Sequence, residues 1–253
     1  EGTLAEKVAQ DQVSAAMPYA PVIIGPLAKS AGVRAANPKI YFVAEDPALG
    51  EYNAIFAGTI CMLENRDAGY EDTDNTEDML RKIMKTNSHV VDQRALLRAR
   101  LLDMIIADWD RHFDNWRWGE HDSAGLTYYK AIPRDRDWAF YFSNGLVPKL
   151  ARLVALRFMI NFSENLKYIN SVNYKGRRLD EIFLHGLDAA TWRETIRQLQ
   201  RDLDDNAIAK AVQNLPPPVF DLIGPSFIKK IKGRRDDLEG QAMKYYRSLA
   251  KTV

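Results

Sequence analysis

The feature that most constrains the fold of this 253-residue chain is a nearly continuous apolar segment that follows Asp92 and ends at an aspartate-rich loop. Its apolar positions are Leu96, Leu97, Ala99, Leu101, Leu102, Ile105 and Ile106. A helix with so little polar surface has to lie inside the fold, so we expect other elements to pack around it. Because the segment runs directly into polar sequence, the buried helix would hold that loop at the edge of the core.

Two aspartate-rich clusters follow, separated by about one hairpin. The first reads DWDRHFDNW and the second reads IPRDRDWAF. Between them, residues 116–118 and 126–132 predict two strands joined by a turn at HDSAG. A hairpin brings the chain back to its starting point, so the two clusters are expected to lie close together.

The spacing within the first cluster indicates phosphoryl-transfer chemistry. Asp110 and Asn115 are five positions apart, as are the catalytic Asp and the metal-binding Asn of a kinase catalytic loop. In such a loop the carboxylate accepts the proton of a hydroxyl group and the Asn amide oxygen binds Mg²⁺. We therefore predict Asp110 as the catalytic residue, and Asn115 with Asp135 or Asp137 as metal ligands.

Each of these signals also has a purely structural interpretation. Asp110 and Asn115 could simply close a turn. Arg111, Arg134 and Arg136 alternate with the carboxylates of the two clusters, where they could bind phosphate or only neutralise buried aspartates. The sequence leaves both roles open for these three arginines.

The rest of the chain predicts an α+β protein with a helical majority. Two apolar runs, Lys39–Ala44 and Phe56–Leu63, predict strands, and Thr76 is a candidate N-cap for a helix over about 77–85. Further helices are predicted over about 3–16, 148–160, 189–203, 226–238 and 239–251, and a short helical turn over 26–31. We expect residues 1–75 to form a small lobe with a helix and two strands, and residues 76–253 to form a helical lobe that carries the catalytic hairpin.

Composition excludes several classes of protein. The net charge of +1 argues against general nucleic-acid binding, which needs a basic excess. Cys61 is the only cysteine, so neither an internal disulfide nor a cysteine-based zinc site can form. No apolar run is long enough for a transmembrane helix, which needs about 18 residues or more.

The two aspartate clusters resemble those of atypical kinase-like proteins. The stretches 108–115 and 133–140 are similar to the spore-coat CotH-like kinases and, more distantly, to HipA-like and secretory-pathway kinases. Phrases such as DQVSAAMPYA, GPLAKSAGV and NPKIYFVAEDPALGEY resemble a module of large Bacteroidetes-type envelope proteins. The resemblance implies a protein-kinase-like fold with a small mixed lobe packed on a larger helical lobe. It also implies a place in the cell envelope, in the periplasm or at the outer membrane, beside neighbouring domains of a larger chain.

The resemblance also assigns roles to particular residues. Met62, Leu63 and Glu64 would lie where a kinase hinge meets adenine, and Arg134 and Arg136 would join them in binding ATP. The chain departs from a standard kinase because it has no Asp-Phe-Gly, no glycine-rich phosphate loop and no lysine on an evident third strand. The small lobe is therefore expected to be incomplete within these residues.

The predicted function is ATP-dependent and Mg²⁺- or Mn²⁺-dependent phosphotransfer to an unknown hydroxyl-bearing acceptor. One alternative is a catalytically inactive, kinase-like scaffold module of an envelope protein. A second is a metal-dependent phosphohydrolase, because Asp135-Arg136-Asp137 is similar to a D-x-D site. That class places small residues after its nucleophile, and the bulky Trp138 fits it poorly.

Overall fold

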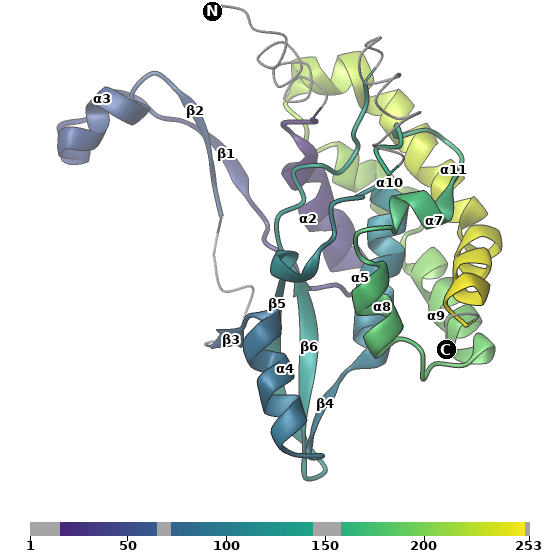
Figure 1. Ribbon diagram of the computed structural model, residues 1–253. Coiled ribbons are helices and arrows are strands. Elements are labelled where there is room, and N and C mark those ends of the chain that lie inside the picture. The colour runs from purple at the N-terminus through teal and green to yellow at the C-terminus, as the bar shows by residue number, and fades with distance from the viewer. Residues whose placement is uncertain (1–15, 65–71, 144–157, 251–253) are drawn as a thin grey trace, which may run out of the picture.

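The computed structural model describes residues 16–64, 72–143 and 158–250, which form a mixed α+β fold dominated by helices (Figure 1). The helices that build the core are α2 (Ala20–Ser30), α5 (Gln93–Ile106), α9 (Ala189–Asp202), α10 (Asp205–Val212) and α11 (Pro217–Leu249). Helix α5 packs against α9 and α11, and α2 packs against α10. All five contribute to one hydrophobic core. Within the described ranges, no helix has both the length and the apolar character needed to cross a membrane.

Helix α5 is the buried helix that the sequence predicts. The Asp92 carboxylate caps its start by accepting a hydrogen bond from the Ala95 amide at 2.9 Å. The predicted burial is confirmed, because Leu101, Leu102, Ile105 and Ile106 are all inaccessible to solvent. The helix ends at Ala107, which has a left-handed backbone conformation with φ of 57°.

An arginine from α11 satisfies the carbonyl groups at the C-terminal end of α5. Arg234 is buried and donates to the carbonyl oxygens of Met104 and Ile105, each at 2.6 Å. These carbonyls belong to the last turn of a helix, where the regular amide partners are missing, although the Ala107 amide also donates to the Met104 carbonyl at 3.4 Å. A cation there also interacts favourably with the helix dipole. Helix α11 thereby fixes the point at which α5 passes into the first aspartate cluster.

A four-stranded sheet lies against the helices in the order β3-β5-β6-β4. Its strands are β3 (Thr73–Asp74), β4 (His89–Val91), β5 (Trp116–Ser123) and β6 (Leu126–Pro133). The predicted hairpin is confirmed as antiparallel β5 and β6, with Trp116 opposite Pro133, although both strands are longer than predicted. Strand β4 pairs with β6 in parallel, and β3 pairs with β5. Both are too short to show the alternation by which a strand is recognised in sequence.

Helix α4 (Thr76–Lys85) lies against β5 and corrects one prediction. Its N-cap is Asn75, which accepts a hydrogen bond from the Asp78 amide at 2.8 Å. Thr76 is the first helical residue, and its hydroxyl donates to the Phe113 carbonyl at 2.6 Å. The threonine hydroxyl therefore joins α4 to the first aspartate cluster, and the capping role falls to its neighbour.

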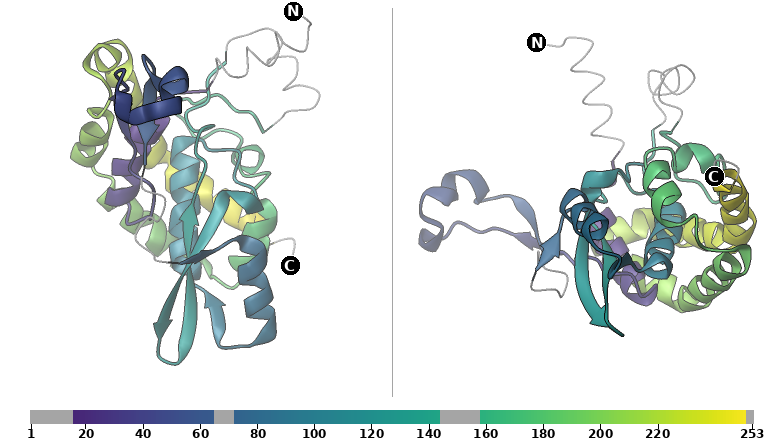
Figure 2. Two further views of the ribbon diagram at one scale, coloured as in Figure 1. Left: turned by 90° about the vertical axis from the view of Figure 1, so that its left-hand side faces the viewer. Right: turned by 60° about the horizontal axis from the view of Figure 1, so that its bottom comes forward.

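The two predicted N-terminal strands form an arm that projects away from the helices (Figures 1 and 2). Within the part of the chain that the structure describes, strands β1 (Lys39–Phe42) and β2 (Ile60–Leu63) pair only with each other, in antiparallel register. Between them lie a 3-10 helix, η1 (Pro47–Tyr52), and a short helix, α3 (Asn53–Phe56). Phe56 was predicted to begin the second strand but ends α3. The arm carries large apolar side chains in solvent, since Phe42, Ile60 and Leu63 are each 68% exposed.

The C-terminal half is helical, as predicted, with two short helices, α7 (Ile169–Val172) and α8 (Arg177–Phe183), before α9. Asp188 caps α9 and Asp204 caps α10, each through its carboxylate. The two helices predicted over 226–238 and 239–251 are instead one helix, α11. Gly240 costs such a helix only about 1 kcal/mol relative to alanine, and packing against α5 and α9 outweighs it.

Two further predictions concern the first half of the chain. The short turn predicted over 26–31 is the end of the longer helix α2, whose first turn contains Pro21. Proline is favoured at that position, because its missing amide would have no partner there in any case. The helices predicted over 3–16 and 148–160 lie outside the described residues, apart from residue 16 and residues 158–160, which are not helical.

Candidate functional site

The first aspartate cluster is a tight loop at the C-terminal end of α5. The Asn115 side-chain amide donates to the Asp110 carbonyl oxygen at 2.6 Å, and the Asp110 amide donates to the Asp108 carboxylate at 3.2 Å. The predicted partners Asp110 and Asn115 are thus held together by one hydrogen bond. The Asn115 side chain is buried.

The Asp110 carboxylate is mostly buried and forms an ion pair with Lys175. Lys175 lies in the turn between α7 and α8, more than sixty residues from Asp110 in the sequence. Sequence reasoning missed this residue. Its only sequence signal is a basic residue in a predicted turn, which is common in any protein.

The hairpin brings the second aspartate cluster back against the first. The Arg134 amide donates to the Asn115 carbonyl oxygen at 2.9 Å, and the Phe140 amide donates to the Ile106 carbonyl oxygen at 2.9 Å. Arg111, which is buried, donates to the carbonyl groups of both Asn115 and Arg134. Backbone groups of the two clusters are therefore in direct contact, as expected.

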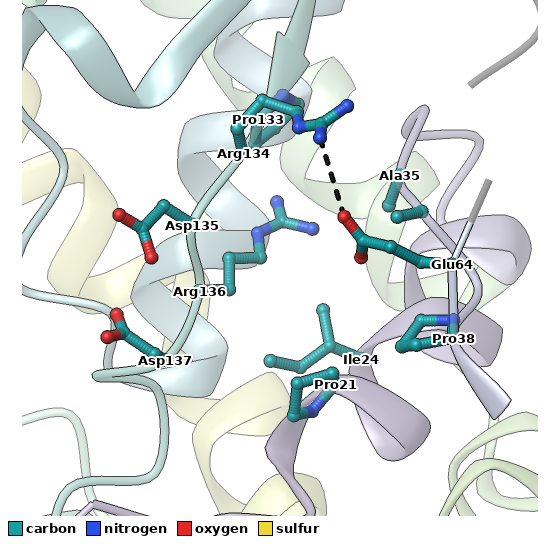
Figure 3. Close-up of a pocket in the computed structure, with 11 residues that line it drawn as sticks. Pro21, Ile24, Ala35, Pro38, Glu64, Pro133, Arg134, Asp135, Arg136 and Asp137 are labelled. Carbon is teal, nitrogen blue, oxygen red and sulfur yellow. Dashed lines mark hydrogen bonds and ion pairs between the residues drawn. The ribbon is translucent and has the colours of Figure 1, made fainter. Parts of the chain in front are cut away.

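A pocket of about 220 Å³ opens beside the second cluster (Figure 3). Five of the predicted site residues line it, namely Glu64, Arg134, Asp135, Arg136 and Asp137. Its apolar wall comes from α2 and the segment that follows, with Pro21, Ile24, Ala35, Ala36 and Pro38. Arg134 also forms an ion pair with Glu64 across the pocket at 3.4 Å.

The remaining predicted site residues lie elsewhere. Met62 and Leu63 are on the exposed arm and do not line the pocket, although they immediately precede Glu64. Asp110 and Asn115 are in the neighbouring loop. The structure therefore places Asp135 and Asp137 with the two arginines at the pocket, and pairs Asp110 with Lys175 in the neighbouring loop.

Arg136 is buried and only partly satisfied. Its Nη2 donates to the Asp103 carboxylate at 3.0 Å, but Nε and Nη1 are buried and have no hydrogen-bond acceptor among the described residues. In Figure 3 its guanidinium group points into the space between Glu64 and Ile24. Each buried N–H group without a partner costs about 1–3 kcal/mol. An anionic ligand in the pocket would remove this cost.

The Asp135 and Asp137 carboxylates lie on the other side of the same strand exit and point toward each other (Figure 3). Asp135 has a left-handed backbone with φ of 52°, which Asp tolerates better than most residues. Burial and, to a smaller extent, the neighbouring Asp135 carboxylate together raise the pKa of Asp137 to about 6. Two carboxylates that resist simultaneous ionisation form a suitable pair of ligands for a divalent cation.

A buried charge network lies beneath both clusters and was not predicted. Asp103 accepts from Arg100 and Arg136 and forms an ion pair with Arg111, with N–O distances of 3.0–3.2 Å. Burial acts to raise the pKa of Asp103, but the three arginines outweigh it and hold the pKa below its usual value. Arg100 also binds Asp180 at 2.9 Å. The only sequence signal was that Arg100 and Asp103 interrupt the apolar run of α5.

The described residues contain no group of three or more His, Cys, Asp or Glu side chains that could hold a metal ion. The predicted metal set differs from such a group because it combines Asn115 with one or both carboxylates of the second cluster. No protein-family model matches this sequence, and a search of curated proteins found no match.

Proposed function

We propose that this protein binds a nucleoside triphosphate with Mg²⁺ or Mn²⁺ and transfers the terminal phosphate to a hydroxyl group, in a kinase-like manner. The observation that carries the proposal is the pocket at the exit of β6. A buried arginine there has N–H groups without an acceptor among the described residues, and two paired carboxylates stand on the other side of the same chain segment. Carboxylates suit a hard divalent cation, and an arginine suits phosphate oxygens.

The order of elements supports the same proposal. A buried helix leads into a loop with Asp and Asn five positions apart, a hairpin follows, and a carboxylate pair stands at its exit. This is the order in which a kinase presents its catalytic base, its metal-binding Asn and its second metal-binding Asp. The pocket is large enough for phosphate groups, and the base would extend toward Glu64 and the arm.

The residues of this chain would act as follows. Asp110 accepts the proton of the acceptor hydroxyl, whose oxygen forms a bond to the terminal phosphorus. The bond from that phosphorus to the bridging oxygen breaks, and the diphosphate leaves. Arg136 holds phosphate oxygens, and a cation bound by Asn115 with Asp135 or Asp137 would neutralise the charge that develops on them.

One observation favours the alternative of an inactive, kinase-like scaffold. The arm exposes large apolar side chains on a sheet of only two strands, a structure that is marginally stable alone in water. Such an arm suits packing against a neighbouring domain, as expected for a module of an envelope protein. In a scaffold the same pocket would bind neither metal nor nucleotide tightly.

Titration calorimetry with Mn²⁺ and ATP tests the proposal. We expect the protein to bind Mn²⁺·ATP, and the double substitution Asp135→Asn with Asp137→Asn to abolish binding. The matched control is Asp221→Asn, which removes an exposed carboxylate on α11 that does not line the pocket. Absence of binding by the unsubstituted protein would favour the scaffold. Release of inorganic phosphate without an acceptor would favour the phosphohydrolase.

A further inference from the structure

Lys175 is presented to the Asp110 carboxylate between aromatic side chains. Its ammonium group donates to Asp110 and lies 5.2 Å from the ring centroids of both Trp109 and Phe158. The Tyr174 ring stacks on Phe158 with an angle of 7° between the ring planes. Aromatic faces attract a cation and restrict the conformations of its side chain. Lys175 is therefore held in place by more than its ion pair.

The turn that carries Lys175 is fixed against the loop that carries Asp110. A Cβ atom on the next residue, Gly176, would lie only 3.0 Å from the Arg111 carbonyl oxygen and would overlap the Arg100 guanidinium group. On the other side of Lys175, the Asn173 side-chain oxygen accepts from Arg100 at 2.8 Å. The turn therefore cannot move away from the Asp110 loop without disturbing the buried charge network. A larger residue at Gly176 would disturb the same network.

Arg111, the cation on the same loop as Asp110, is already committed to structural contacts. Arg111 is 1% exposed and is used by the Asp103 and Asp108 carboxylates and by two backbone carbonyls. Lys175 differs because its side chain is 33% exposed. An ammonium group has three N–H donors, and Asp110 uses one of them. Within the described residues, Lys175 is the only cation in an ion pair with the Asp110 carboxylate.

We propose that Lys175 is a further catalytic residue of this site, which orients the Asp110 carboxylate and binds the phosphoryl group that is transferred. The inference rests on the proposed function and deepens it. Lys175 holds one oxygen of Asp110, so the other oxygen is left to accept the hydroxyl proton. A second N–H of Lys175 donates to an oxygen of the terminal phosphate. Its positive charge opposes the negative charge on the oxygens around the terminal phosphorus.

This role makes a prediction that a structural ion pair does not. Lys175 contacts only the terminal phosphate, so it distinguishes a triphosphate from a diphosphate. We expect Lys175→Met to weaken the binding of Mn²⁺·ATP by about tenfold or more, the usual effect of losing a hydrogen bond to a charged group. The affinity for Mn²⁺·ADP should stay unchanged. Lys175→Arg keeps the charge and should restore most of the preference for ATP.

The experiment is calorimetry of Mn²⁺·ATP and Mn²⁺·ADP with the intact chain and these two variants. Lys232→Met is the matched control, because Lys232 also pairs with an aspartate, Asp205 at 2.9 Å, and its side chain is similarly exposed at 31%. Where turnover is measured, Lys175→Met should lower kcat more than it raises KM for the acceptor.

The outcomes separate this inference from the proposed function. If the unsubstituted protein binds neither nucleotide, the proposed function fails, and the role of Lys175 fails with it. If it binds both and Lys175→Met weakens ATP and ADP equally, or changes neither, the proposed function stands and the inference about Lys175 is wrong. A lowered Tm for Lys175→Met with an unchanged ratio of ATP to ADP affinity would identify the ion pair as purely structural.

Discussion

Replacement of Arg136 by methionine should cost far less stability than a buried ion pair normally does. Removing one partner of such a pair typically costs about 3–5 kcal/mol. Arg136→Met loses one hydrogen bond of 3.0 Å to Asp103, which keeps Arg100 and Arg111 as partners. The substitution also removes two buried nitrogens that have no acceptor among the described residues. Removing each of them should stabilise the folded state by about 1–3 kcal/mol. The expected net loss in the free energy of unfolding is about 0–2 kcal/mol.

Asp103→Asn is the informative comparison. It leaves Arg100, Arg111 and Arg136 without the carboxylate that they share, so we expect a loss of about 3–5 kcal/mol. Urea denaturation followed by circular dichroism at pH 7.5 measures both variants, and a constant m-value shows that the same transition is compared. If Arg136→Met is as destabilising as Asp103→Asn, its N–H groups are not poised for a ligand and the argument from the pocket fails.

The same pair of variants also reports on the ligand. A ligand that binds only the folded state raises stability by RT ln(1 + [L]/Kd). Saturating Mn²⁺·ATP should therefore raise the urea midpoint of the unsubstituted protein and leave that of Arg136→Met almost unchanged. An equal rise in both would show that the nucleotide does not contact Arg136.

Three further predictions concern the pKa of Asp137, the end of α5 and the arm. The folded-state pKa of Asp137 is raised from 3.8 to about 6, so the stability this group contributes is present below pH 4 and is lost as the pH rises through 6. Asp137→Asn should accordingly stabilise the protein by about 1 kcal/mol at pH 8, after allowance for solvent exposure, and have no effect at pH 3.5 in the same urea assay. Arg234→Met should lower the free energy of unfolding by about 3–5 kcal/mol and speed amide hydrogen exchange near the end of α5, because buried carbonyls lose their donor. Ile60→Lys should change the Tm very little, since Ile60 is 68% exposed, but should reduce self-association measured by light scattering.

The elements that could be predicted from sequence are those with a strong local pattern. The apolar run of α5 and its cap at Asp92 define that helix, and turn residues between two runs that contain aromatic residues define the β5–β6 hairpin. Two helices were predicted where α11 is a single helix. Its packing against α5 and α9 outweighs the cost of Gly240, and this packing is not visible in local sequence. The short strands β3 and β4 depend on β5 and β6 for their pairing.

The candidate site was predicted as far as spacing allows. Asp110, Asn115 and the second aspartate pair could be chosen because a hairpin has to bring its ends together. Lys175 could not be chosen, because its contact with Asp110 depends on how the turn before α8 packs against Arg100. The partial satisfaction of Arg136 likewise depends on atoms from α5 that no spacing rule identifies.

The most direct test of the account is a crystal structure of this chain with a non-hydrolysable ATP analogue and Mn²⁺, with the metal located by its anomalous scattering. The account predicts Mn²⁺ bound to a carboxylate oxygen of Asp135 or Asp137 and to the Asn115 side-chain oxygen, at about 2.0–2.2 Å. It also predicts a phosphate oxygen within hydrogen-bond distance of Arg136. Mn²⁺ and nucleotide bound at another surface, with the N–H groups of Arg136 still lacking acceptors, would contradict the assignment of this pocket as a phosphate and metal site.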